Sequence, residues 1–440
     1  MASAFVQEDP LREVLIDLYP VVLIDESQDT HEGVMEALLA VQAYASDRFV
    51  LGLLGDTMQR IYTHGMQGLD AAVPPDWARP AKVMNHRSAE RIVRLLNAIR
   101  MEADGQQQRA RRDKPGGFAR VFITALGAAN SLELEEKVAQ RMVDVTGDAA
   151  WGLGPEHRKT LVLEHRMASR RLGFDDVFGP LYETETLRTS LLEGVLAPIN
   201  FLLDDLLPVV EAGLSDDQFA LVDSVRTRSP LFEGKALAGR IDQLEAIRSA
   251  GDGARRLTEQ MRARDPFLGE VISSLRDSGL LTVPDVLLQA LDAGAPGEAP
   301  PKDSDRAVLE LHAWGRVMEA PFSQVRAMAL YARGLSAFDT HQGVKGLEFP
   351  RVLVVISDDE ANGFTFSYDK VLGIKAADKD AEKEAGGGDS QRAQTRRLLY
   401  VTCSRAEESL ALVVYAENPR AVGDIVIRRG WFREDEVVVI

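Results

Sequence analysis

Two acidic side chains stand directly after the first apolar run of the sequence. Val21–Ile24 is followed at once by Asp25 and Glu26. Open α/β sheets bind ligands at the carboxyl ends of their strands, where adjacent carboxylates can divide two tasks. Asp25 can hold a Mg²⁺ ion that bridges nucleotide phosphates, and Glu26 can orient and deprotonate an attacking water. An ordinary strand that ends in an acidic helix cap is the alternative for this motif alone.

A second motif, Gly-Asp-Thr-Met-Gln-Arg-Ile-Tyr, follows the apolar run Phe49–Leu54. The amide of Gln59 can sense a γ-phosphate, and Tyr62 can stack on a base, a contact worth ~1–3 kcal/mol. Taken alone, these residues also fit a turn with a core tyrosine.

Two arginines lie in motifs that suit phosphate binding. Arg87, in Asn-His-Arg-Ser, can reach phosphate oxygens bidentately, and Ser88 is a candidate N-cap for the helix that follows. Arg405, in Leu-Leu-Tyr-Val-Thr-Cys-Ser-Arg-Ala, can act as an arginine finger that stabilises charge on a γ-phosphoryl group. Each arginine by itself also fits a solvated surface position.

The segment Asp339–Phe349 is a loop with two glycines, which let a backbone approach a ligand closely. Thr340, His341 and Lys345 can contact a nucleic-acid backbone. Glu348 can accept a hydrogen bond from a ribose hydroxyl. An ordinary glycine-containing loop is the alternative.

The elements around these motifs predict an α/β fold. The two apolar runs read as buried parallel strands, and Val34–Ala45 between them has helical spacing. A second α/β region is split by about 150 residues of helical periodicity, which include Ala236–Ser249 and Gly253–Arg264. We predict a solvated, mobile loop over residues 376–394. The split region's predicted helices are Ala89–Met101 and Leu132–Val145, and its predicted strands are Ala119–Thr124, Thr160–Glu164, Ala337–Asp339, Arg351–Ile356 and Leu410–Tyr415.

The composition is that of a globular protein, with 45% apolar and 27% charged residues. A single cysteine, Cys403, excludes a disulfide framework and fits a reducing, cytoplasmic compartment. The acidic start does not resemble a signal peptide, and no apolar run approaches the ~20 residues of a membrane span. The net charge of −17 argues against a protein that wraps duplex DNA through a basic face, but it allows a groove for single strand.

The five motifs, in this order, resemble motifs II to VI of UvrD/Rep-like superfamily 1 DNA helicases. The resemblance implies two RecA-like domains of the P-loop NTPase type, the first incomplete, with a mainly helical insertion in the second. The implied boundaries are 1–80 for the first domain, 81–175 and 331–440 for the two parts of the second, and 176–330 for the insertion.

The resemblance also implies an ATP-dependent, 3′ to 5′ movement along single-stranded DNA, with ATP and Mg²⁺ as cofactors. It makes Asp25 the metal ligand, Glu26 the catalytic base, and Gln59, Arg87 and Arg405 the γ-phosphate contacts. The remaining implied contacts are Gly346 and Glu348 to the nucleotide, and Tyr62, His64, Thr340, His341 and Lys345 to DNA.

One part of such an engine does not occur in this sequence. Its phosphate-binding loop ends in Gly-Lys-Ser/Thr, whereas the chain's single Gly-Lys pair, Gly234-Lys235, is followed by Ala236. The family's Trp-Arg pair after the motif III tyrosine is also replaced, by His64-Gly65. We therefore expect an N-terminally truncated or split helicase that is inactive alone. The alternatives are a non-catalytic module that binds DNA or a nuclease partner, and a two-part helicase whose loop comes from a separate polypeptide.

Overall fold

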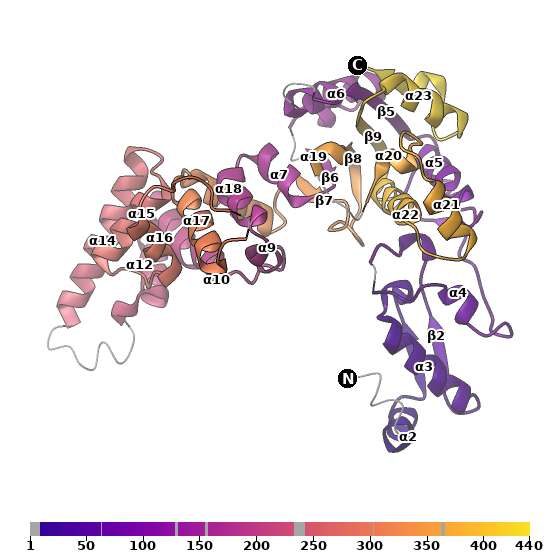
Figure 1. Ribbon diagram of the computed structural model, residues 1–440, viewed down its shortest axis with the longest axis horizontal. Helices are drawn as coiled ribbons and strands as arrows, with labels where there is room; N and C mark the ends of the chain where they lie inside the picture. Colours follow the sequence, from indigo (N-terminus) through magenta and orange to yellow (C-terminus); the bar gives the residue numbers. More distant parts are fainter. Residues whose placement is uncertain are drawn as a thin grey trace. The chain divides into compact units, whose positions relative to one another are not determined.

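The computed structural model describes residues 9–62, 64–127, 131–154, 157–232, 243–301, 303–361 and 366–440 (Figure 1). The chain divides into two compact units, one formed by Met1–Glu164 with Ala337–Ile440 and the other by His165–Ser336. No helix in the described ranges combines the length and apolar character that a bilayer crossing needs.

The first unit is built on a six-stranded sheet in the order β10-β5-β9-β8-β6-β7, in which every pair is parallel. Its central strands are continuous apolar runs because both faces are covered, as in Val352–Ile356 and Leu410–Val414. This confirms the predicted α/β class with a parallel sheet. The strands are β5 (Phe118–Ala125), β6 (Lys159–Val162), β7 (Phe338–Thr340), β8 (Phe349–Ile356), β9 (Ala406–Ala416) and β10 (Val437–Val439).

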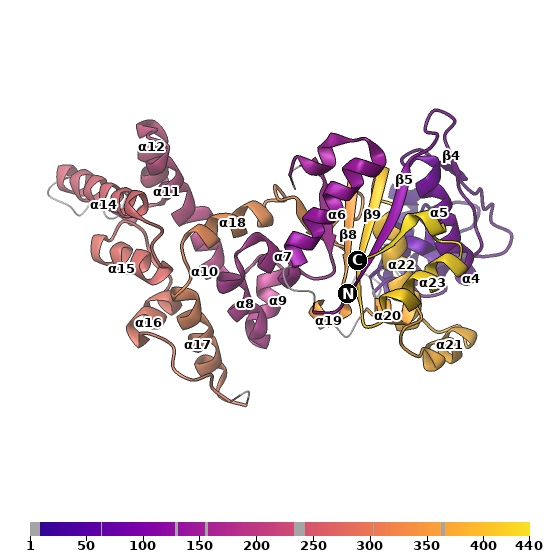
Figure 2. The same ribbon diagram turned by 90° about the horizontal axis from the view of Figure 1, so that it is seen from above.

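Helices cover this sheet on both sides, with α6 (Ser131–Thr146) on one side of the central strands and α5 (Glu90–Met101) with α22 (Gln391–Cys403) on the other (Figure 2). A further helix, α23 (Pro419–Arg428), packs on β5, β9 and β10. The expected N-cap of α5 is wrong: Ala89 occupies that position. Ser88 instead donates its hydroxyl to the carbonyl of Ala406, 2.7 Å away, and so ties the start of α5 to β9.

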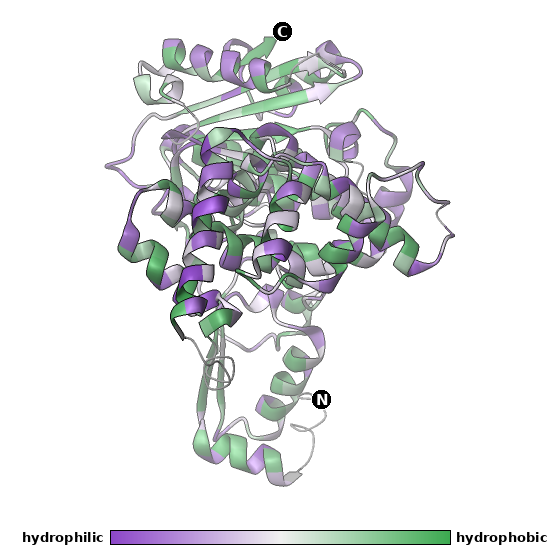
Figure 3. Cartoon of the chain, turned by 90° about the vertical axis from the view of Figure 1, so that its left-hand side faces the viewer, coloured by the Kyte–Doolittle hydropathy of each residue, from purple (hydrophilic) through white to green (hydrophobic). Residues whose placement is uncertain are grey.

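A smaller parallel pair precedes this sheet, formed by β1 (Val21–Ile24) and β2 (Val50–Leu53). Two helices, α2 (Asp9–Leu18) and α3 (Glu32–Tyr44), pack on one face, around a core of Ile16, Val41, Ala45, Phe49 and Leu51. On the other face, Val21, Leu23 and Val50 are 57%, 68% and 57% exposed. The prediction of parallel strands is confirmed, but the prediction that they are buried is wrong, because one helical layer covers one face. Figure 3 colours both strands as hydrophobic.

The segment 376–394 also differs from its prediction as a solvated loop. It contains the helix α21 (Asp378–Ala385) and the first turn of α22. Asp389 lies between these helices and forms ion pairs with Arg60 and Arg397, at 2.5 and 2.8 Å. These pairs fix the segment against the residues that follow β2.

The regular elements described in the second unit are helices, packed around a core that includes Phe174, Leu257 and Trp314. Of the predicted helix Ala236–Ser249, residues 236–242 lie outside the described ranges. The described helices of the second unit are α7 (His165–Leu172), α8 (Asp175–Glu183), α9 (Glu185–Leu192), α10 (Ala197–Asn200), α11 (Leu207–Leu214), α12 (Gln218–Arg228), α14 (Gln243–Ala263), α15 (Leu268–Ser278), α16 (Asp285–Ala293), α17 (Arg306–Met318) and α18 (Ser323–Ala332), with a π-helical turn at Phe201–Leu206.

Candidate active site

The carboxyl end of β1 presents the two carboxylates that the sequence singled out. Glu26 has φ 50° and ψ 40°, a left-handed conformation that non-glycine residues seldom adopt. Its backbone N–H donates to Oδ1 of Asp25 at 2.9 Å. The Asp25 side chain is exposed at the strand end. Backbone strain of this kind concentrates where geometry serves a site, because the surrounding structure has to enforce it.

A buried amide, Gln28, connects the ends of β1 and β2. Its Nε2 donates to Oε2 of Glu26 at 2.6 Å, and its Oε1 accepts the backbone N–H of Asp56 at 3.1 Å. A Cβ at Gly55 would lie 2.3 Å from that Oε1, so only glycine leaves room for the amide. Gln28 was not among the predicted site residues, although its place two residues after Glu26 was a usable signal.

Lys345 reaches the same carboxylate from the loop between β7 and β8. Its ammonium pairs with Oε2 of Glu26 at 2.9 Å and also with Asp29. Burial opposes ionisation of Glu26, but the hydrogen bonds from Lys345 and Gln28 outweigh it, so the pKa of Glu26 is lowered. Glu26 is therefore ionised at neutral pH, as a general base must be, and Lys345 compensates its charge.

Two arginines form a second cluster with Glu348. Nε of Arg87 pairs with Oε2 of Glu348 at 2.8 Å, and Nη1 of Arg87 donates to the carbonyl of Ser404 at 3.1 Å. Arg405 is 1% exposed and donates from Nη2 to Oγ of Ser404 at 2.7 Å. Burial, followed by repulsion from Arg87, lowers the pKa of Arg405 to about 10, which leaves it protonated at neutral pH. Two cations on one framework suit an anion such as a phosphoryl group.

The other residues expected to contact the nucleotide are Gln59 and Gly346. Gln59 donates from Nε2 to Oδ2 of Asp56 at 3.3 Å. Gly346 lies in the exposed loop before β8 with φ 85°, a conformation that requires glycine. Asp56 has a partner that was not among the predicted site residues: Arg100, from α5, binds both of its carboxylate oxygens, at 2.7 and 3.1 Å. Arg100 is 4% exposed, so this is a buried ion pair.

The five expected DNA contacts separate into two groups. Tyr62 and His64 are exposed and stacked, with ring centroids 5.5 Å apart, and the Lys345 ammonium lies 5.9 Å from the Tyr62 ring. Thr340 and His341 are buried. The exposed rings of Tyr62 and His64 and the partly buried ammonium of Lys345 therefore lie together.

His341 has a structural role in this arrangement. Its Nδ1 contacts the hydroxyl of Tyr368 at 2.8 Å, and its Nε2 contacts the carbonyl of Leu161 at 3.2 Å. Burial lowers its pKa to about 4, so the ring is neutral. Thr340 likewise accepts the backbone N–H of Gly343 through Oγ1. Both side chains are enclosed and engaged within the protein, so the expected contacts of Thr340 and His341 with DNA stay predictions.

Packing explains the glycine that follows His64. A Cβ at Gly65 would lie 2.2 Å from the carbonyl oxygen of Gln28. The arginine that the family carries at this position would therefore not fit against this backbone. The close approach keeps the loop after β2 in contact with the residues that place Glu26.

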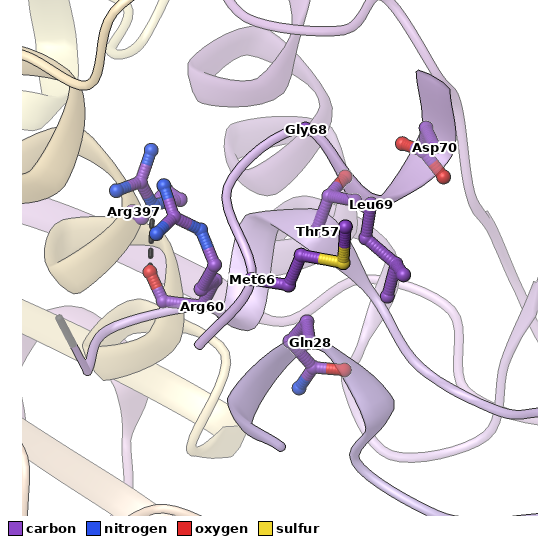
Figure 4. Close-up of a pocket in the computed structure, with 8 residues that line it drawn as sticks. All are labelled: Gln28, Thr57, Arg60, Met66, Gly68, Leu69, Asp70 and Arg397. Carbon is purple, nitrogen blue, oxygen red and sulfur yellow. Dashed lines mark hydrogen bonds between the residues drawn. The ribbon is translucent and has the colours of Figure 1, made fainter. Parts of the chain in front are cut away.

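A small cavity lies beside Gln28, with Thr57, Arg60, Met66 and Arg397 in its wall (Figure 4). Its volume is about 200 Å³, smaller than the ~300–1,000 Å³ that sites for whole small molecules occupy. Arg397 donates from Nε to the carbonyl of Arg60 at 2.6 Å across it. The cavity therefore suits water or a small ion better than a nucleotide.

The chain resembles one curated protein over most of its length. It is 22% identical to Gabija protein GajB of Bacillus cereus (strain HuB5-5). The match extends over 444 residues and covers 93% of this chain and 60% of that relative. The chain thus spans less than two thirds of the length of the protein it matches. No family model matches the sequence.

Proposed function

We propose that the chain is part of an ATP-driven DNA helicase or translocase of the UvrD/Rep type, with 3′ to 5′ movement on single strand. The observation that carries this proposal is the ionised Glu26, held at a strand end within reach of the charge of Arg405. The order of the five motifs supports it, and the distant similarity to Gabija protein GajB supports a helicase-related function at low identity. We place the protein in the cytoplasm.

The residues fit ATP with Mg²⁺. Asp25 would hold the metal, since Mg²⁺ is bound through one or two carboxylates plus phosphate oxygens and water, and the ion neutralises phosphate charge. Glu26 accepts the proton of the attacking water. Arg87 and Arg405 stabilise negative charge on the γ-phosphate, and Glu348 accepts a hydrogen bond from a ribose hydroxyl. This last role requires Glu348 to exchange its present bond to Arg87.

The bare face of β1 and β2 bears on the missing phosphate-binding loop. Parallel sheets are covered on both faces, so exposed Val21, Leu23 and Val50 are suited to a further layer. A parallel strand added beside this pair would bring the loop after it to the edge that holds Asp25 and Glu26. We propose that a segment with a Gly-Lys-Ser/Thr loop, from the same polypeptide or a partner, covers this face.

A second function, a non-catalytic module that binds DNA or a nuclease partner, is favoured by one contact. Lys345 compensates the charge of Glu26, as a structural ion pair would. DNA-stimulated ATP hydrolysis distinguishes the two functions. The chain is assayed alone and with a polypeptide that supplies the loop, and Glu26→Gln is the control. We expect hydrolysis that requires both DNA and Glu26. Turnover that is absent with every loop-bearing segment tried would establish the binding module instead.

A further inference from the structure

A short two-stranded sheet projects from the first unit, apart from its main sheet. β3 (Met84–Asn85) pairs in parallel with β4 (Arg109–Ala110), in the register Met84 to Arg109. The backbone N–H of Arg109 donates to the carbonyl of Val83 at 2.7 Å, which extends the pairing toward Lys82. We call residues 82–85 and 109–112 the basic spur; β4 marks its position in Figure 2.

The charge around the basic spur is opposite to that of the whole chain. Residues 79–114 hold ten lysines and arginines against four acids, in a protein of net charge −17. Four of the ten cations pair with acids from other segments: Arg87, Arg91, Arg100 and Lys114. Each of the four acids already has an arginine partner. The pairs are Glu90–Arg94 at 2.5 Å, Glu102–Arg429 at 3.6 Å, Asp104–Arg100 at 2.8 Å and Asp113–Arg111 at 2.6 Å.

Three cations of the basic spur have no such partner. Lys82, Arg109 and Arg112 are exposed, and within the described part of the chain no hydrogen bond or ion pair engages their side chains. Arg109 pairs with Met84 in the register, Lys82 lies two residues before that position, and Arg112 lies in the turn after β4. The uncompensated charge of the spur is therefore entirely positive.

Hydrogen bonds anchor the base of the basic spur. Gln108 donates its backbone N–H to Oδ1 of Asn97 and accepts from Nδ2 of Asn97 through its carbonyl, both at 2.8 Å. Its side chain accepts from Asn85 at 2.8 Å and donates to the Tyr400 hydroxyl at 3.1 Å. An anchored backbone has less conformational entropy to lose when a ligand binds, so the basic spur is preorganised for binding.

We propose that the basic spur binds the phosphate backbone of duplex DNA, at a surface separate from Tyr62, His64 and Lys345. Single-strand sites combine charge with aromatic stacking, whereas the exposed side chains of the spur at 82–84, 109, 111 and 112 are cationic or aliphatic. Charge without stacking groups fits duplex phosphates, which bind cations regardless of sequence. The proposal rests on the proposed function only in taking DNA as the ligand.

The salt dependence of DNA binding tests the proposal. Affinities for a blunt duplex and for oligothymidine are measured by fluorescence anisotropy over a salt series. The variant carries Lys82→Ala, Arg109→Ala and Arg112→Ala together. Each lost duplex phosphate contact reduces the slope of log K against log salt by ~0.9, so we expect a decrease of ~2.7 for three contacts. The corresponding slope for oligothymidine stays at its wild-type value.

A matched variant controls for net charge. Arg226→Ala, Arg255→Ala and Arg306→Ala remove three exposed arginines from the helical unit, each paired with a nearby acid. We expect it to keep the wild-type duplex slope, as should the charge-preserving Arg109→Lys. Equal duplex slopes for the wild type and the spur variant would overturn the proposal, as would equal losses for duplex and oligothymidine. If oligothymidine binds and the duplex does not, the spur proposal fails while the proposed function stands; if neither binds, the proposed function fails too.

Discussion

Replacing Gln28 with leucine tests whether one buried amide sets the state of the proposed base. Gln28 is 2% exposed, and its amide serves the Glu26 carboxylate and the backbone N–H of Asp56 together. Leucine fills similar space but leaves that N–H without its acceptor, at a cost of ~1–3 kcal/mol. The leucine variant also loses the hydrogen bond from Gln28 to Glu26, but water can replace most of it, because the Glu26 side chain is half exposed. We expect the free energy of unfolding to fall by about 2 kcal/mol.

The same change should also move the pKa of Glu26. Gln28 is one of the donors that lower it, so Gln28→Leu should raise the pKa toward its ordinary value. Urea denaturation gives the stability, and carbon-13 NMR titration gives the pKa, with the resonance assigned through Glu26→Gln. Gln28→Glu is the matched control: it keeps an acceptor for Asp56 but sets a second carboxylate beside Glu26, so the pKa should rise further. A leucine variant within about 0.5 kcal/mol of wild type, with an unchanged pKa, would refute the reasoning.

Three further predictions concern neighbouring groups. Arg100→Met should lower the free energy of unfolding by ~3 kcal/mol in urea, because it leaves Asp56, whose side chain is 16% exposed, without its cation. An added Asp56→Asn should recover part of this loss, and additive losses would contradict the pair. Lys345→Met should raise the pKa of Glu26 in the NMR titration, and no change would show that the ion pair does not form in solution. His341 has a pKa of about 4 in the folded protein, against 6.5 in the unfolded chain. As the pH falls from 6.5 to 4, the unfolded state takes up the proton first, so the free energy of unfolding decreases by up to ~1.4 kcal/mol per pH unit. His341→Gln should remove this slope, and parallel stability profiles would refute it.

Local sequence pattern was sufficient for five of the six strands of the main sheet, whereas the edge strand β10 was not predicted. The runs Arg351–Ile356 and Leu410–Tyr415 lie within β8 and β9, because strands covered on both faces must be apolar at every position. The same rule failed for Val21–Ile24. Its apolar residues are equally continuous, yet whether a face is covered depends on a layer that the run itself does not encode. The charged composition of 376–394 likewise concealed a helix and the paired Asp389.

The candidate site was predictable where a residue's role follows from its position on a strand. Asp25 and Glu26 stand at a strand end in the sequence and in the structure. Arg100 gave no such signal, since an arginine in the last turn of a helix is usually solvated and only the fold brings Asp56 to it. His341 shows the converse: its motif indicated a ligand contact, but the hydroxyl of Tyr368 and burial under the loop decide its state.

Lys345 connects two parts of the site that the sequence treated separately. Its ammonium lies against the Glu26 carboxylate and near the ring of Tyr62, which is stacked on His64. A DNA phosphate that attracts this ammonium would compete with Glu26 for it, and the pKa of Glu26 would then rise because a hydrogen-bonded cation is lost. By thermodynamic reciprocity, protonation of Glu26 would strengthen phosphate binding at Lys345 to the same degree. The proton affinity of the base and the affinity of this surface for DNA are therefore expected to change together, through one side chain.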